Sequence, residues 1–67
     1  MFRNLEAEQA RFGFNNQDMA AILGISRVSY ESKKKSGKFT TMEIKTLCKT
    51  FGCKFDYLFE AKNDREE

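Results

Sequence analysis

The segment 27–38, RVSYESKKKSGK, gathers side chains that can bind an anionic partner. It carries one acid, Glu31, and five basic residues, although the formal net charge of the 67-residue chain is only +2. The basic residues are Arg27, Lys33, Lys34, Lys35 and Lys38. A guanidinium offers a planar fork of N–H donors to carboxylate or phosphate oxygens, and an ammonium group acts as a mobile point charge. The secondary structure of this segment determines where these charges point.

Other kinds of site have little support in the composition. Histidine is absent, which removes the commonest general base and metal ligand. The chain has no glycine-rich phosphate loop and no paired carboxylates on a common face, so we expect no enzyme, no metal and no cofactor. Cys48 and Cys53 are too few for a zinc site. They can form a disulfide, but we favour small buried thiols in a cytosolic protein.

The charge is unevenly distributed along a chain of single-domain size. Residues 1–59 hold ten Lys/Arg against six Asp/Glu, which gives +4, whereas residues 60–67, EAKNDREE, hold two against four, which gives −2. We expect a basic domain over 1–59 and an acidic, frayed tail over 60–67. The N-terminus is charged from its third residue, unlike a signal peptide, and no apolar run reaches membrane-spanning length. These features predict a cytoplasmic protein.

The periodicity is helical throughout. Single glycines at 13, 24, 37 and 52 divide the chain into helix-sized segments, and no strand alternation is present. We predict an all-α domain of five helices, at about 3–12, 16–23, 27–35, 41–51 and 55–60. Asn15 and Ser26 are the expected N-caps of the second and third helices, and Thr40 with Glu43 forms a capping box, the only role we assign to that pair. The expected inward-facing residues are Leu5, Gln9 and Phe12; Met19, Ala20 and Leu23; Ile44, Leu47, Cys48 and Phe51; and Phe55, Leu58 and Phe59.

The predicted helices 16–23 and 27–35 have the pattern of a helix-turn-helix. Two closely crossing helices need a small residue where they touch, which Ala20 supplies. The turn needs a residue with positive φ, which Gly24 supplies. Ile25 and Tyr30 can serve as apolar plugs behind the turn. The combination is specific, whereas each position alone would mean little.

The helix 27–35 then has an outer and an inner side. At about 100° per residue, Tyr30 and Lys33 point toward the body of the domain. The residues on the opposite face are Arg27, Val28, Glu31 and Lys35, with Ser32 at its edge. A helix anchored in this way can lie in the major groove of DNA with its first residues on the base edges.

The residue types on this face suit contact with DNA. Arginine can grip guanine, an apolar side chain can pack on the thymine methyl, and carboxylate or hydroxyl groups can bond to the remaining base edges. We predict base contacts from Arg27, Val28, Glu31 and Ser32. We predict phosphate contacts from Asn16, Gln17, Lys34, Lys35 and Lys38, two of them at the start of the preceding helix and three around the end of this one.

An ordinary solvated surface is the alternative interpretation. Arg27–Glu31 and Glu31–Lys35 are each spaced i, i+4, so they can form a ladder of salt bridges. Lysines at a helix C-terminus are favoured by the helix dipole in any case. We favour DNA binding because a salt-bridge ladder leaves the helix-turn-helix pattern unexplained.

The stretch FNNQDMAAILGISRVSYESKKKSGKFTTMEI, followed by LCKTFGCKFDYLF, resembles the helix-turn-helix domains of the phage Cro and lambda-repressor family over about residues 4–59. The resemblance implies a five-helix domain that binds operator DNA as a dimer and represses or switches transcription in a bacterial cell or phage-infected host. It places Asn16 at a phosphate-contacting position and Arg27, Val28 and Ser32 at base-reading positions. Lys33 departs from the family, which has an apolar residue there. Either its stem lies along the core with the ammonium at the edge, or the helix is shorter or displaced.

The aromatic residues near the C-terminus suggest a contact with another protein chain. We propose from the sequence that Phe55, Tyr57 and Phe59 make a two-fold contact in a homodimer; the alternative is that all but Tyr57 belong to the core. The second hypothesis for function is a protein-binding module that modulates a repressor, with Val28 and these aromatic residues as its contacts. A negatively charged recognition helix would favour that hypothesis, whereas this helix is basic.

Overall fold

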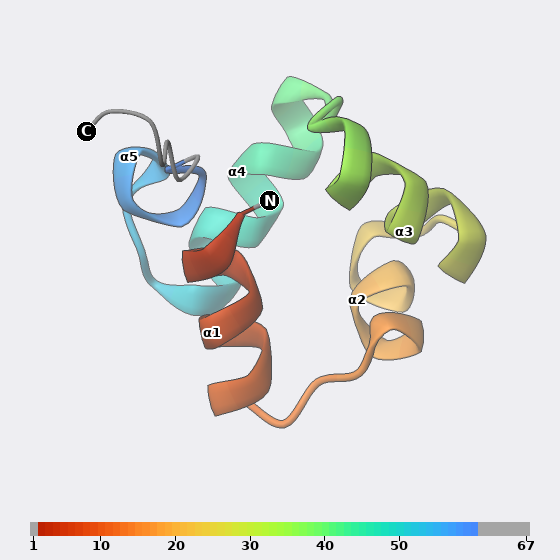
Figure 1. Cartoon of the computed structure of the whole chain (residues 1–67), viewed down its shortest axis with the longest axis horizontal. Coiled ribbons are helices and arrows are strands. Elements are labelled where there is room, and N and C mark those ends of the chain that lie inside the picture. The colour runs from red at the N-terminus through yellow and green to blue at the C-terminus, as the bar shows by residue number, and fades with distance from the viewer. Residues whose placement is uncertain (1, 61–67) are drawn as a thin grey trace.

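The structure, a computed structural model, describes residues 2–60, which form five α-helices and contain no strand. The helices are α1 (Arg3–Arg11), α2 (Asn16–Leu23), α3 (Arg27–Ser36), α4 (Thr41–Phe51) and α5 (Phe55–Leu58). Helices α2 and α3 lie toward one end of the long axis and α5 toward the other, with α4 between them (Figure 1). The all-α prediction is confirmed, although α1 ends one residue earlier than expected, α3 continues one residue further and α5 ends two residues earlier. The frayed tail was predicted over residues 60–67. Of these, residues 61–67 lie outside the described part of the chain.

Three helices begin at the caps that the sequence predicts. The Asn15 side chain accepts a hydrogen bond from the Asp18 N–H (2.8 Å), and the Asp18 carboxylate accepts one from the Asn15 N–H (3.0 Å). Thr40 and Glu43 make the same reciprocal pair at the start of α4. Ser26 Oγ accepts from the Ser29 N–H at 3.1 Å and caps α3. Local hydrogen bonding therefore fixes where α2, α3 and α4 start.

The connection between α2 and α3 depends on Gly24. Its φ of +72° lies in the left-handed region, which glycine adopts without the penalty that a Cβ would bring. This conformation lets the Ile25 N–H reach back to the Ala20 carbonyl (3.0 Å) and close α2. Ala20 itself is fully buried, and α2 and α3 pack against each other across this turn.

The core takes residues from all five helices. Its fully buried members are Leu5, Met19, Ala20, Tyr30, Leu47 and Leu58, and Phe51 is nearly so. Phe2 and Phe39, from outside the helices, join Phe59 in an aromatic cluster with ring centroids 5.3 and 5.5 Å from that of Phe59. Phe12 differs from the prediction and is 41% exposed. Because it follows the last residue of α1, its ring lies edge-on against Phe51 at the surface rather than in the core.

Replacing Thr40 by Ala removes the hydroxyl that caps α4. We expect the free energy of unfolding to fall by about 1 kcal/mol, measured by urea denaturation followed by circular dichroism. The matched control is Thr41→Ala, since the exposed Thr41 side chain makes no hydrogen bond within residues 2–60. We expect that change to cost less than about 0.5 kcal/mol. Equal losses in the two variants would contradict the capping role.

Candidate nucleic-acid interface

The outer side of α3 is an exposed surface of mixed chemistry. Val28 is 68% exposed, and Arg27, Ser32 and Lys35 are exposed beside it. A shallow depression on this side is lined by Val28, Ser29, Ser32, Lys33, Ser36 and Lys38. The structure thus brings together three residues that the sequence analysis assigned to DNA, two as base contacts and one as a phosphate contact.

Arg27 and Glu31 form an intrahelical ion pair on the exposed side of α3. Arg27 Nη1 lies 2.9 Å from Glu31 Oε2, and both side chains are substantially exposed. The same carboxylate oxygen accepts a hydrogen bond from Asn16 Nδ2 at 3.0 Å. The Asn16 amide and the Arg27 guanidinium together hold the pKa of Glu31 below its ordinary value. The second pair of the alternative salt-bridge ladder, Glu31–Lys35, is not formed in the described part of the chain.

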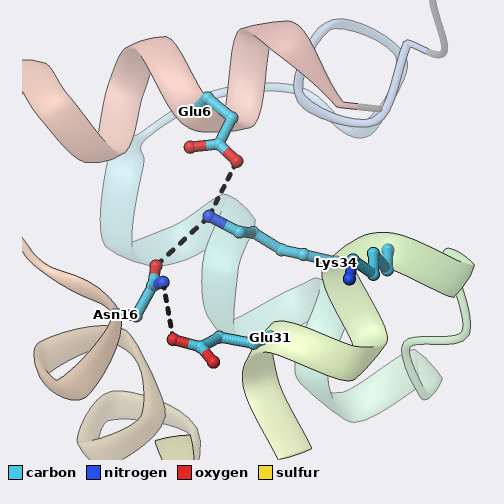
Figure 2. Close-up of a pocket in the computed structure, with 5 residues that line it drawn as sticks. Glu6, Asn16, Glu31 and Lys34 are labelled. Carbon is cyan, nitrogen blue, oxygen red and sulfur yellow. Dashed lines mark hydrogen bonds and ion pairs between the residues drawn. The ribbon is translucent and has the colours of Figure 1, made fainter. Parts of the chain in front are cut away.

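Lys34 is directed into the molecule instead of toward a partner. Its Nζ lies 2.8 Å from Glu6 Oε2 and 3.2 Å from Asn16 Oδ1, as Figure 2 shows. The ammonium also lies 5.1 Å from the centre of the Tyr30 ring, and the side chain is only 13% exposed. The phosphate contact predicted for Lys34 does not fit this placement. The physical reason is its i+4 relation to the buried Tyr30, which puts it on the side of α3 that faces α1 and α2.

Asn16 is likewise occupied inside the molecule. Its Oδ1 accepts hydrogen bonds from Gln9 Nε2 (3.0 Å) and Lys34, while its Nδ2 donates to Glu31. Both ends of the amide are therefore used between α1, α2 and α3 (Figure 2). Asn16 is half-buried, and the phosphate contact predicted for its side chain does not fit this arrangement. Gln17, beside it in the first turn of α2, is exposed as a phosphate contact requires.

A buried polar pair underlies this network. The Tyr30 hydroxyl donates to Gln9 Oε1 at 2.8 Å, and the two side chains come from α3 and α1. Tyr30 is fully buried and Gln9 is only 7% exposed. Burial raises the pKa of Tyr30 well above its ordinary value, so the phenol stays protonated and keeps its donor. The sequence analysis missed this role of Gln9, although a polar residue on a buried helix face implies a buried hydrogen-bond partner.

Lys33, which stands where the Cro and lambda-repressor family has an apolar residue, forms an ion pair with α4. Lys33 Nζ lies 3.3 Å from Glu43 Oε1, and the lysine side chain is 25% exposed. Burial opposes ionisation of Glu43, but hydrogen bonds from Thr40 and the Lys33 ammonium outweigh it and lower its pKa. Glu43 therefore has a second role beside capping. Helix α3 is not shortened at Lys33 but continues to Ser36.

The three aromatic residues predicted for a dimer contact do not behave alike. Phe59 is half-buried against the core, whereas Phe55 is 52% exposed. The Tyr57 hydroxyl donates to Glu8 Oε2 at 3.0 Å, and Glu8 also pairs with Arg11 at 2.8 Å. The alternative that all but Tyr57 belong to the core is therefore wrong for Phe55. The reason is its position as the first residue of α5, where the preceding turn leaves it uncovered.

Comparison with known proteins gives no relative. No protein-family model matches the chain, and no curated protein or solved structure shows significant similarity to it. The resemblance to the Cro and lambda-repressor family therefore stays a prediction from the sequence. Within residues 2–60, no helix is long and apolar enough to cross a membrane, and no group of three side chains is placed to hold a metal ion.

A double-mutant cycle tests the Tyr30–Gln9 hydrogen bond. Tyr30→Phe leaves the buried Gln9 oxygen without its best donor, so we expect a loss of about 1 to 3 kcal/mol in the free energy of unfolding. The double variant Tyr30→Phe/Gln9→Leu, which also lacks the acceptor, should lose less free energy of unfolding than the sum of the two single losses. Tyr57→Phe provides the matched control, because Tyr57 bonds to Glu8 and not to Gln9. Additive effects of Tyr30→Phe and Gln9→Leu would contradict the pairing.

The ionised Glu31 carboxylate gives a pH dependence of known sign. Its pKa is lowered in the folded protein from an ordinary value of 4.5, so its contribution to stability is present above that pH and lost as the pH falls through the folded value. We expect the free energy of unfolding of the wild type to fall more steeply below about pH 5 than that of Glu31→Gln. Asp56→Asn, which removes an exposed carboxylate without an ion pair within residues 2–60, is the control for the loss of one acidic group. Parallel curves for wild type and Glu31→Gln would contradict this contribution.

Proposed function

We propose that this protein binds double-stranded DNA through the outer side of α3 and regulates transcription by reading a specific sequence. The observation that carries the proposal is the division of α3 into two sides. The inner side is fixed by the buried Tyr30–Gln9 bond and by two ion pairs, whereas the outer side presents Arg27, Val28 and Ser32 to solvent. A short helix that follows a tight turn and is held rigidly from behind suits insertion into the major groove.

The outer side offers three kinds of base contact. The Arg27 guanidinium can make two hydrogen bonds to guanine, Val28 can pack on a thymine methyl, and Ser32 can donate or accept. In the free protein Arg27 uses Nη1 for its ion pair with Glu31, which leaves its other N–H donors for a base. Glu31 is itself held by the hydrogen bond from Asn16. We therefore propose that the main role of Glu31 is to orient Arg27. The base contact predicted for Glu31 is then its secondary role.

We propose a smaller set of phosphate contacts than the five predicted residues. Lys33 is paired with Glu43 and Lys34 with Glu6, so their charges are compensated inside the molecule. Lys35 and Lys38 are exposed and make no ion pair within residues 2–60. Together with Gln17 at the start of α2, they are the residues that we propose to flank the groove and meet phosphates.

We propose the homodimer for the DNA-bound state. Two copies on an inverted repeat would place their α3 helices about 34 Å apart, one turn of DNA. For the two-fold contact we retain Tyr57, which is 40% exposed. Phe59 is packed with Phe2 and Phe39, and Phe55 lies beside exposed lysines that a second copy would repel. Sedimentation equilibrium on duplexes with one or two half-sites tests this point, and one copy bound to a complete inverted repeat would contradict it.

Substitutions on α3 separate sequence reading from charge. On a duplex selected from a random pool, we expect Arg27→Ala to cost about 1 to 3 kcal/mol of binding free energy and to relax the preference at one base pair. Lys35→Ala should weaken binding to every duplex and lower the salt slope by about one. The measurement is fluorescence anisotropy at several salt concentrations.

The matched control is Arg3→Ala, which removes an exposed arginine of α1 without an ion pair within residues 2–60. It should leave the affinity and the preference unchanged. If Arg27→Ala weakened all duplexes equally, Arg27 would be a phosphate contact and the proposed orientation of α3 would be wrong. If no sequence were enriched from the pool, sequence-specific reading would be ruled out.

A further inference from the structure

An apolar groove lies beside α4 and α5. Ile44 and Cys48 from α4 and Cys53 and Phe55 from the following segment form its uncharged lining. All but Phe55 are half-buried, and Phe55 is 52% exposed. Burial, with a smaller effect of Cys53, raises the pKa of the Cys48 thiol, so this thiol stays neutral. The groove thus places one exposed aromatic ring beside a neutral apolar floor.

Three lysines border the same groove: Lys45, Lys49 and Lys54. Lys45 and Lys49 are four residues apart in α4, so their ammonium groups lie on the same side of that helix. All three are exposed, and no carboxylate of residues 2–60 is within ion-pair distance of them. This differs from Lys33 and Lys34, whose charges are both compensated. The groove therefore combines an apolar floor with an uncompensated positive border.

A second copy of this chain fits the groove poorly. A two-fold contact brings the same patch of both copies together, so the three lysines of one copy would meet those of the other. Like charges placed together across an interface cost several kcal/mol. The aromatic ring of Phe55 could be covered in such a contact, but the lysines would oppose it.

The acidic segment 60–67 of this chain and DNA also fit poorly. The segment EAKNDREE carries the opposite charge, but alanine is its largest apolar residue and cannot fill the floor. A phosphate backbone would satisfy the lysines and leave Ile44 and Phe55 facing a polar surface. Helix α5 also lies toward the end of the molecule opposite α3, which carries the surface proposed for DNA (Figure 1).

We propose that the α4–α5 groove binds an acidic amphipathic helix of a partner protein. Large apolar side chains of that helix, spaced i, i+3 or i+4 and i+7, would insert between Ile44 and Phe55. Asp or Glu residues on both sides of its apolar stripe would face the lysines of the border. This proposal does not rest on DNA binding, and it places a protein contact on a different surface from α3.

The test uses a labelled synthetic helix with leucines at that spacing and glutamates along both flanks, titrated with the full chain by fluorescence anisotropy. We expect saturable binding that weakens as salt is added. Phe55→Ala should lower the affinity at least about fivefold. Lys45→Glu with Lys49→Glu should lower it about tenfold or more and reverse the dependence on salt. A peptide with every glutamate replaced by lysine should not bind.

Arg3→Glu is the control for a charge reversal elsewhere on the surface and should bind the peptide like the wild type. Amide chemical shifts of the labelled wild type should change within residues 44–55 when the peptide is added, which supports the proposal without any variant. No binding by the wild type, or changes elsewhere, would overturn it. It would also be overturned if the lysine variants weakened DNA binding and left peptide binding intact, or if Phe55→Ala dissociated a dimer.

Discussion

The hydrogen bond from the Tyr30 hydroxyl to Gln9 Oε1 fixes how α3 is presented, and the rest of the candidate site depends on it. Two buried polar groups are tolerated in a core only when each has a partner. Without the Tyr30 hydroxyl, Gln9 Oε1 keeps only the longer contact from Lys34, at 3.4 Å, so we expect a cost of about 1 to 3 kcal/mol. The bond joins α1 to α3, which are far apart in the sequence. Together with the ion pairs of Lys33 and Lys34, it holds the inner side of α3 against the domain, so that the opposite side faces outward.

From this bond a chain of polar contacts leads to the surface. The Gln9 amide donates to Asn16, Asn16 donates to Glu31, and the Glu31 carboxylate holds Arg27. The Lys34 ammonium lies against the oxygens of Asn16 and Glu6, which settles the direction in which the Asn16 amide points. A residue proposed to read a base is in this way connected to the core through three side chains. Such support from behind is what keeps an exposed side chain in one geometry before it binds.

The sequence was sufficient for the features that local chemistry decides. The caps at Asn15, Ser26 and Thr40 and the positive φ at Gly24 involve residues within a few positions of each other, so their types alone predict them. The helical wheel also predicted the burial of Tyr30 and the exposure of Val28.

Features that depend on how the helices pack were not predictable in the same way. Predicting the pairing of Lys34 with Glu6 required knowing that the side chains of α1 and α3 reach each other, and predicting the pairing of Lys33 with Glu43 required the placement of α4. Counting charges along residues 27–38 consequently overstated the charge available to a partner. Phe12 and Phe55 were expected to face inward from their positions on the predicted helices, but they lie at helix ends and are 41% and 52% exposed.

The central claim is that the outer side of α3 is the surface that contacts DNA, and mapping the contact on the intact protein tests it most directly. Amide chemical shifts of the isotopically labelled chain would be followed while a selected duplex is added. The largest changes should fall within residues 27–38 and at Gln17, while residues 44–55 stay nearly unchanged. Largest changes within α4 and α5, or small changes spread evenly over the whole surface, would contradict the account.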